Sequence, residues 1–200
     1  MDAMEVLTNL EQIQPYFQPV FSADEHIAVG YEILGRYVDD SGIISLGEFF
    51  EDESIPDEYR IEVDNVVLRQ ALEKCMGAEE NALLFINRDP KLLMLDHGES
   101  FLKILKKEIG EEQLGRVVVV LSSKKLQGET EGIQHLLNYY RTYGIKVAAA
   151  HLDADSKLDN ISAFSPNILK VNMEAIRSQG WDVQKEFLEQ LGRLARKMGA

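Results

Sequence analysis

The chain has 200 residues, of which 45% are hydrophobic and 28% charged, and its net charge is −13. This length is typical of one domain that buries its own core, so we expect a single domain over residues 1–200. The excess of acidic residues argues against a nucleic-acid polymer or an anionic membrane as a partner, because like charges repel. Cys75 is the only cysteine, which excludes an intramolecular disulfide and a cysteine-based zinc cluster.

No segment has the pattern of a membrane or export signal. The longest aliphatic run, residues 117–121, is too short to span a bilayer. The N-terminal residues mix acids with apolar residues and lack the basic start and apolar core of a signal peptide. We therefore expect a cytoplasmic protein without a membrane partner.

Hydrophobic periodicity predicts strands that alternate with helices along most of the chain. In chain order we expect helix 2–13, strands 17–21 and 27–36, helices 46–52 and 57–75, strand 82–87, helix 99–109, strand 117–121, helix 131–143, strand 146–152, a short segment near 158–164, strand 168–171 and helix 183–198. Such alternation favours parallel βα units. The uninterrupted aliphatic run at 117–121 favours a sheet covered by helices on both faces. The pattern therefore indicates an α/β protein that opens with a hairpin.

Five short motifs, in matching order and spacing, resemble those of the EAL domain family. Residues 16–21 (YFQPVF) resemble its first strand, and residues 31–36 (YEILGR) resemble the motif that names it, an aromatic residue followed by Glu-Ala-Leu-x-Arg. Residues 85–87 (FIN), 143–148 (YGIKVA) and 165–172 (SPNILKVN) resemble segments of the third, fifth and sixth strands. The resemblance covers almost the whole chain. It implies a TIM-barrel-like (β/α) fold with an antiparallel first strand.

The resemblance also implies a site for cyclic-di-GMP, the substrate of the phosphodiesterases in this family. In them, two divalent metals bind the scissile phosphate and activate a water. Glu32 and Asn87 stand at two metal-ligand positions, and Lys170 stands at the position of a lysine. Gln18 and Arg36 match positions that contact the nucleotide. These five residues are the candidate remnant of a ligand site; the alternative is that they bond only to one another or to water.

Other positions of the same site lack the family's carboxylates, and the valine and alanine among them cannot bind a metal. Val120 and Ser123 stand where the family's fourth strand has glutamates. Ala150 and His151 replace the aspartate pair of the fifth strand. A divalent cation needs several oxygen ligands to offset its dehydration. We therefore expect no metal, no cofactor, no catalytic residue and no hydrolysis of cyclic-di-GMP.

A replacement metal site is a weaker hypothesis. His151, Asp153 and Asp155 alternate along a strand end and would share one face. The segment lacks the glycine and the terminal glutamate of a calcium loop, so a solvated polar loop is the favoured interpretation.

The last two strands of the family's barrel are not in this sequence. We therefore expect an incomplete or open fold of about six strands, whose outer strands offer unpaired edges. Either the chain is a piece of a longer protein, or a homo-oligomer or another protein covers these edges, and we favour such a protein partner.

Three functions remain open at this point. The leading interpretation is a catalytically inactive EAL-like domain that acts in cyclic-di-GMP-related signalling through protein–protein contacts. The first alternative is a receptor that binds cyclic-di-GMP without cleaving it. The second, least favoured, is an active phosphodiesterase with an altered site.

Overall fold

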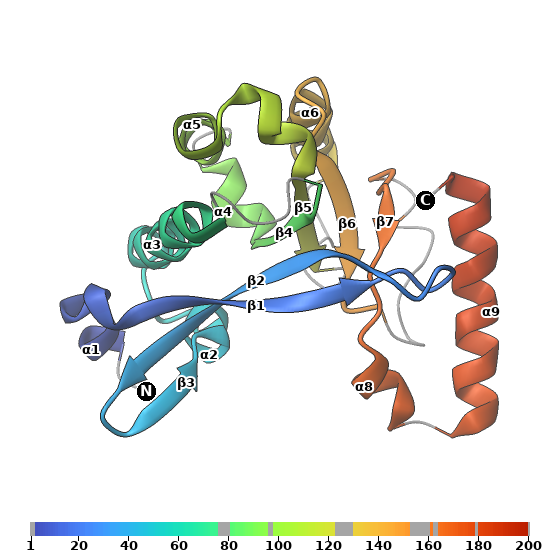
Figure 1. Cartoon of the computed structure of the whole chain (residues 1–200), viewed down its shortest axis with the longest axis horizontal. Coiled ribbons are helices and arrows are strands. Elements are labelled where there is room, and N and C mark those ends of the chain that lie inside the picture. The colour runs from blue at the N-terminus through green and yellow to red at the C-terminus, as the bar shows by residue number, and fades with distance from the viewer. Residues whose placement is uncertain are drawn as a thin grey trace. The chain divides into compact units, whose positions relative to one another are not determined.

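The computed structural model describes residues 3–75, 81–95, 98–122, 130–152, 161, 164–178 and 180–199. The chain divides into two compact units. The first contains residues 1–87 and 99–116, and the second contains residues 88–98 and 117–200. Each unit is an α/β structure, and the described strands and helices are labelled in Figure 1.

The first unit is built on a long antiparallel hairpin. Its elements are α1 (Ala3–Thr8), the 3-10 turn η1 (Leu10–Gln12), β1 (Ile13–Phe21), β2 (Ala28–Asp39), β3 (Gly42–Ser45), α2 (Gly47–Glu51), α3 (Asp57–Cys75), β4 (Leu83–Arg88), α5 (Glu99–Ile109) and η2 (Glu111–Arg116). Strand β2 pairs antiparallel with β1 and β3, and parallel with β4. The antiparallel first strand that we expected is thus confirmed.

Helix α3 covers this hairpin and carries much of the first unit's core. Val63, Leu68 and Leu72 are buried, and the helix contacts β1, β2 and α5. Burying one such side chain stabilises the fold by roughly 1.5 to 3 kcal/mol. The predicted helices 57–75 and 99–109 agree with the structure at both ends, because their apolar residues recur at helical spacing.

The second unit has parallel strands throughout its sheet. Its elements are α4 (Pro90–Met94), β5 (Val117–Ser122), α6 (Thr130–Arg141), β6 (Lys146–Ala150), β7 (Ile168–Leu169), α8 (Met173–Arg177) and α9 (Trp181–Met198). Strand β6 lies between β5 and β7 and is parallel to both. Every residue from 117 to 121 is at most 2% exposed, so the strand is covered on both faces, as its sequence indicates.

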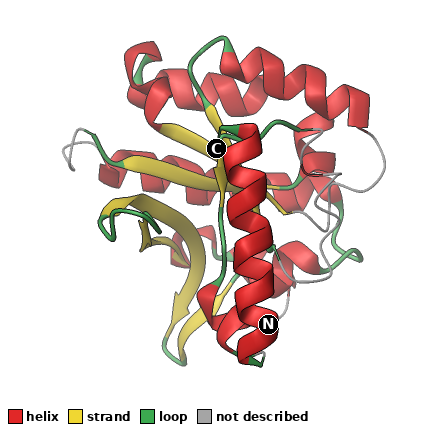
Figure 2. Cartoon of the chain, turned by 90° about the vertical axis from the view of Figure 1, so that its right-hand side faces the viewer, coloured by secondary structure: helices red, strands yellow, loops and turns green. Residues whose placement is uncertain are grey.

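Helix α9 packs beside β7 within this unit. Phe187 and Leu191 are one helical turn apart and pack into a buried cluster with Ile176, Leu152 and Ala149. The helix ends at Gly199, whose φ of 70° is the left-handed conformation common after a last helical turn. Figure 2 shows α9 as one continuous helix in the foreground.

Two differences from the expected elements lie at the start of the chain. The predicted helix 2–13 stops at Thr8, where the Asn9 side-chain amide donates to the carbonyl of Glu5. Ile13 is already in β1, and Pro15 could not have continued a helix. Strand β3 was missed because its pairing depends on the turn after Asp39, whose carboxylate accepts hydrogen bonds from the backbone of two following residues.

The remaining differences are short elements. Helices α4 and α8, each five residues long, were not predicted, whereas the equally short α2 lies within the predicted helix 46–52. Segments of this length show less than two helical turns of periodicity. Strands β6 and β7 are shorter than expected. Of the predicted segment near 158–164, most residues lie outside the described part of the chain.

Within the described residues, β1 pairs only with β2, and β7 pairs only with β6, so the strands do not close into a barrel. The expected open α/β fold is therefore confirmed. No described helix is long and apolar enough to cross a membrane.

Candidate functional site

The candidate site in the first unit is centred on a hydrogen bond between two adjacent parallel strands. Asn87 Nδ2 donates to Glu32 Oε1 at 3.0 Å. Glu32 lies on β2 and is only 8% exposed, whereas Asn87 lies near the carboxyl end of β4 and is partly buried. A hydrogen bond to a charged acceptor in a buried place is stronger than a neutral one, so the bond holds both side chains in position.

Strand register explains why these residues meet. Glu32 is the partner of Phe85 across the parallel pair of β2 and β4. Asn87 is two residues beyond Phe85 and therefore points to the same side of the sheet. Gln18 lies directly opposite Glu32 on β1, so it shares that side as well, and it is exposed. Three of the predicted site residues are thus brought to one face.

A glycine permits the close approach of these strands. Gly30 pairs with Leu83 at the start of the β2–β4 ladder. A Cβ atom at Gly30 would lie 2.1 Å from the carbonyl oxygen of Leu83, a distance that no side chain can occupy. Gly30 immediately precedes the family-like motif at residues 31–36, and its close contact with the neighbouring backbone requires glycine.

Arg36 lies on the same face of β2 as Glu32 but further along the strand. Four residues of strand separate them by about 13 Å. The Arg36 guanidinium is partly buried and donates from Nη1 to its neighbour's carbonyl, Gly35 O, at 2.9 Å. The structure thus places Arg36 apart from the bonded pair, at a distance that a dinucleotide-sized ligand could span.

Lys170 belongs to the second unit, where it follows β7 directly. Its backbone nitrogen donates to the carbonyl of Ala149 on β6 at 2.8 Å, and the residue is partly buried. The approach to β7 is fixed from two sides. Asn167 exchanges two hydrogen bonds with the backbone of Val147, at 2.9 and 2.8 Å. Arg141 Nη2 donates to the carbonyls of residues 164 and 165 at 2.6 and 2.9 Å.

The positions where the family has carboxylates are apolar and buried in the second unit. Val120 is 2% exposed and Ala150 is 1% exposed. His151, the residue after β6, is exposed and adopts a left-handed φ of 55°, which is uncommon outside glycine. Ser123, Asp153 and Asp155 lie outside the described residues, so the replacement metal site stays a prediction.

The sequence analysis did not single out Arg88, a buried cation next to Asn87. Burial lowers the pKa of the Arg88 guanidinium to about 10, which still leaves it protonated at neutral pH. Neighbouring strand residues point to opposite faces, so Arg88 faces away from the side of Asn87.

The described residues do not fit a two-metal centre. Glu32 and Asn87 supply two oxygen ligands, and the buried Val120 and Ala150 supply none. No group of three or more His, Cys, Asp or Glu side chains within the described ranges is placed to hold a metal ion. Such an arrangement can accept hydrogen bonds, but these described residues alone lack the set of carboxylates that holds paired metals in phosphodiester hydrolysis.

Comparison with known proteins places this geometry in a family. The model of the EAL domain matches residues 2–200. The uncharacterized EAL-domain containing protein YkuI of Bacillus subtilis (strain 168) is 45% identical over 203 residues, covering 100% of this chain. The chain spans about half the length of this relative, 50% of it.

Solved structures agree with that placement. The crystal structure of the B. subtilis YkuI protein, with an EAL domain, in complex with substrate c-di-GMP and calcium, is 44% identical, with a TM-score of 0.89. It is matched over 100% of this chain and 50% of that one. An EAL domain protein from Listeria monocytogenes EGD-e is 16% identical, with a TM-score of 0.76 over 100% of this chain and 81% of its own; that similarity shows the fold alone.

Proposed function

The chain belongs to the EAL domain family, and we propose from this that it binds cyclic-di-GMP without hydrolysing it. The observation that carries the proposal is a contrast between two sets of residues at family ligand positions, one in each unit. The Glu32–Asn87 bond is intact, whereas Val120 and Ala150 are buried and apolar where metal ligands would be needed. Polar groups for holding a ligand thus remain without the groups for cleaving it.

Support for binding comes from the relative and from charge. The YkuI protein, 44% identical to this chain, is known in complex with c-di-GMP and calcium. The ligand carries two phosphates, and Arg36 and Lys170 are cations at positions that the family resemblance assigns to it. An arginine can bind phosphate through two parallel hydrogen bonds, and a lysine acts as a point charge. Gln18 adds an exposed amide beside Glu32.

Support for the absence of hydrolysis comes from the ligand count. Lowering the pKa of a nucleophilic water and stabilising the leaving oxygen both depend on cations held by several carboxylates. A carboxylate and an amide alone leave most of a divalent cation's coordination to water.

Calorimetric titration tests the proposal, with cyclic-di-GMP added in EDTA and then in excess Ca²⁺. We expect a Kd at or below about 100 μM, which corresponds to a binding free energy of roughly 5.5 kcal/mol. The product of a parallel incubation with Mg²⁺ or Mn²⁺ is separated by chromatography, and we expect intact dinucleotide. An absence of heat in both buffers argues against the receptor, whereas turnover above a protein-free blank argues against inactivity.

A second candidate function is a protein-interaction module. Trp181 and Leu188 on α9 are 76% and 41% exposed, although apolar side chains of this size are usually buried. The two functions are compatible, because these residues and the Glu32–Asn87 pair lie on different elements.

A further inference from the structure

The face of the β1–β2 hairpin that carries Gln18 and Glu32 also carries an aromatic side chain, that of Tyr16. Strand register pairs Tyr16 with Leu34, and these two residues lie two positions along their strands from Gln18 and Glu32. Side chains two residues apart on a strand point to the same side, so all four share one face. Tyr16 therefore belongs to the candidate site by its position, although the sequence analysis did not single it out.

Tyr16 also lies at the level of Asn87 on the next strand. Ile33 pairs with Ile86 in the parallel ladder of β2 and β4, so the residues that follow them, Leu34 and Asn87, lie side by side. The strand order β1-β2-β4 then places Tyr16, Leu34 and Asn87 in one row across three strands. Adjacent strands are about 4.8 Å apart, so roughly 10 Å separate the backbones of Tyr16 and Asn87.

Apolar side chains occupy the middle of this hairpin face, and polar side chains occupy both ends. Gln14 pairs with Arg36 at one end, and Gln18 pairs with Glu32 at the other. Tyr16 lies about 7 Å along β1 from each of the two glutamines. The tyrosine is 39% exposed, so part of its side chain is open to a ligand. An aromatic ring between hydrogen-bonding side chains is the arrangement that many proteins use to hold an unpaired base.

We propose that Tyr16 is a stacking surface for one purine base of the bound dinucleotide, with the exposed amides of Gln14 and Gln18 on either side of that base. Stacking needs no metal, whereas binding of the phosphates opposes the net charge of −13 on the chain. This inference rests on the proposed binding of cyclic-di-GMP. It adds that base stacking supplies part of the affinity at a site whose described residues lack the carboxylates of a metal centre.

Calorimetric titration of cyclic-di-GMP in EDTA tests the role of the ring. Tyr16→Ala and Tyr16→Leu should each raise the Kd roughly 5- to 100-fold, because neither side chain has an aromatic face. Tyr16→Phe keeps the ring and should bind as tightly as wild type. The same fold-changes are expected in excess Ca²⁺, because the stacked base does not contact a metal.

Phe17→Ala is the matched control. Phe17 is the next residue on β1 and is 36% exposed, but it lies opposite Ile33 and therefore points to the other side of the hairpin. Its replacement should leave the Kd unchanged. Thermal unfolding of every variant separates a loss of binding from a loss of structure.

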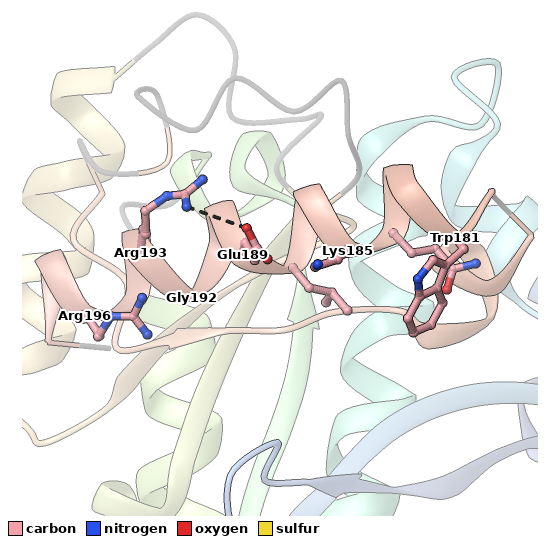
Figure 3. Close-up of a pocket in the computed structure, with 8 residues that line it drawn as sticks. Trp181, Lys185, Glu189, Gly192, Arg193 and Arg196 are labelled. Carbon is pink, nitrogen blue, oxygen red and sulfur yellow. Dashed lines mark ion pairs between the residues drawn. The ribbon is translucent and has the colours of Figure 1, made fainter.

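Fluorescence reports on stacking directly, because a guanine stacked on an indole ring quenches its emission. Trp181 is the only tryptophan in the chain and lies exposed on α9 (Figure 3), so Trp181→Phe gives a background without tryptophan emission. In that background, cyclic-di-GMP should quench the emission of Tyr16→Trp. It should leave the emission of Phe17→Trp unchanged.

Two results would overturn the inference and leave the receptor function standing. One is a wild-type protein that binds cyclic-di-GMP while Tyr16→Ala and Tyr16→Leu bind it equally well, even if their unfolding temperatures fall; Tyr16 would then serve packing alone. The other is a Kd for Tyr16→Phe as high as that for Tyr16→Ala, which would assign the contact to the hydroxyl group. An absence of binding by wild type in both buffers overturns the proposed function, and this inference with it.

Discussion

The side-chain amide of Asn87 bonds to the carboxylate of Glu32 across 55 residues of sequence and 3.0 Å of space. The bond joins β2 to β4, and its acceptor is almost fully buried. A buried carboxylate is costly unless it accepts hydrogen bonds, so the bond from Asn87 stabilises the sheet as well as shaping the site. The residue that the family resemblance assigns to ligand binding therefore also has a structural role.

Replacing Asn87 with aspartate should make the free energy of unfolding depend more strongly on pH than it does in wild type. Two adjacent carboxylates repel, which raises the pKa of one of them in the folded state. A raised folded-state pKa contributes stability that is present at low pH and lost as pH rises. The free energy of unfolding of Asn87→Asp should therefore be lower than that of wild type by about 1 to 3 kcal/mol near pH 7. Near pH 5 the difference between the two proteins should be smaller. Urea unfolding at both pH values measures this.

The control for that variant is Asn138→Asp. Asn138 is exposed and already accepts a hydrogen bond from Arg141 at 2.7 Å, so a carboxylate there meets a cation. Equal losses of stability for both variants, or a loss at position 87 that does not depend on pH, would contradict the role of the Glu32 carboxylate.

Gly30→Ala should prevent the normal pairing of β2 with β4. The added Cβ would lie 2.1 Å from a backbone carbonyl, which cannot rotate away as a side chain can. We expect a loss of more than about 3 kcal/mol, seen as insoluble protein or a low unfolding temperature. Gly115→Ala is the control, because nothing lies within 4 Å of its Cβ position. Normal stability for Gly30→Ala would show that the strands are not paired in this register.

Restoring carboxylates tests the proposed cause of the absence of hydrolysis. In Val120→Glu with Ala150→Asp, two charges would enter positions that are at most 2% exposed. We expect a loss of several kcal/mol without metal, because an unpaired buried charge is costly. Mg²⁺ or Mn²⁺ should recover part of this loss, as a metal that binds only the folded state stabilises it. Thermal unfolding with and without metal is the measurement, and Val120→Gln with Ala150→Asn is the uncharged control.

Arg141→Ala should loosen the approach to β7 and so weaken ligand binding through Lys170. The carbonyls of residues 164 and 165 would each lose a hydrogen bond from a charged donor. Each lost bond lowers the free energy of unfolding by at most about 3 kcal/mol. We expect a lower unfolding temperature together with weaker binding of cyclic-di-GMP, and partial rescue by Arg141→Lys. Arg193→Ala, which removes an exposed ion pair, should change neither property. Unchanged dinucleotide affinity in Arg141→Ala would separate this loop from the ligand site.

Acid should destabilise the turn after β2. The hydroxyl of Ser41 donates to the Asp39 carboxylate, backbone donors add to it, and together they hold the pKa of Asp39 below its usual value. A lowered folded-state pKa contributes stability that is present above the unfolded pKa of about 3.9 and lost as pH falls through the folded value. Between neutral and acidic pH, the urea unfolding midpoint of Asp39→Asn should therefore fall less than the midpoint of wild type. Asp24→Asn, in an exposed turn, is the control, and an acid response identical to wild type in Asp39→Asn would contradict the assignment.

Elements with a long hydrophobic period could be predicted from the sequence. Helices α3 and α5 and the start of β5 agree with prediction because each buries a continuous apolar face, and that face is written in the residue spacing. The short β3 and α4 could not be predicted in this way. Their hydrogen bonds depend on Asp39 and Asp89, whose carboxylates accept from backbone groups two residues onward.

For the candidate site, the sequence by itself determined the residue types and thus the chemistry they exclude. It showed Glu32 and Asn87 in family-like motifs, and Val120 and Ala150 where carboxylates would be needed. Only the tertiary structure decided which of these residues meet. The Glu32–Asn87 bond depends on the register of two strands that are paired through their backbones, and backbone pairing leaves no local pattern in the sequence. The same reason applies to α9, because packing against other elements of its unit decides that Phe187 and Leu191 are buried.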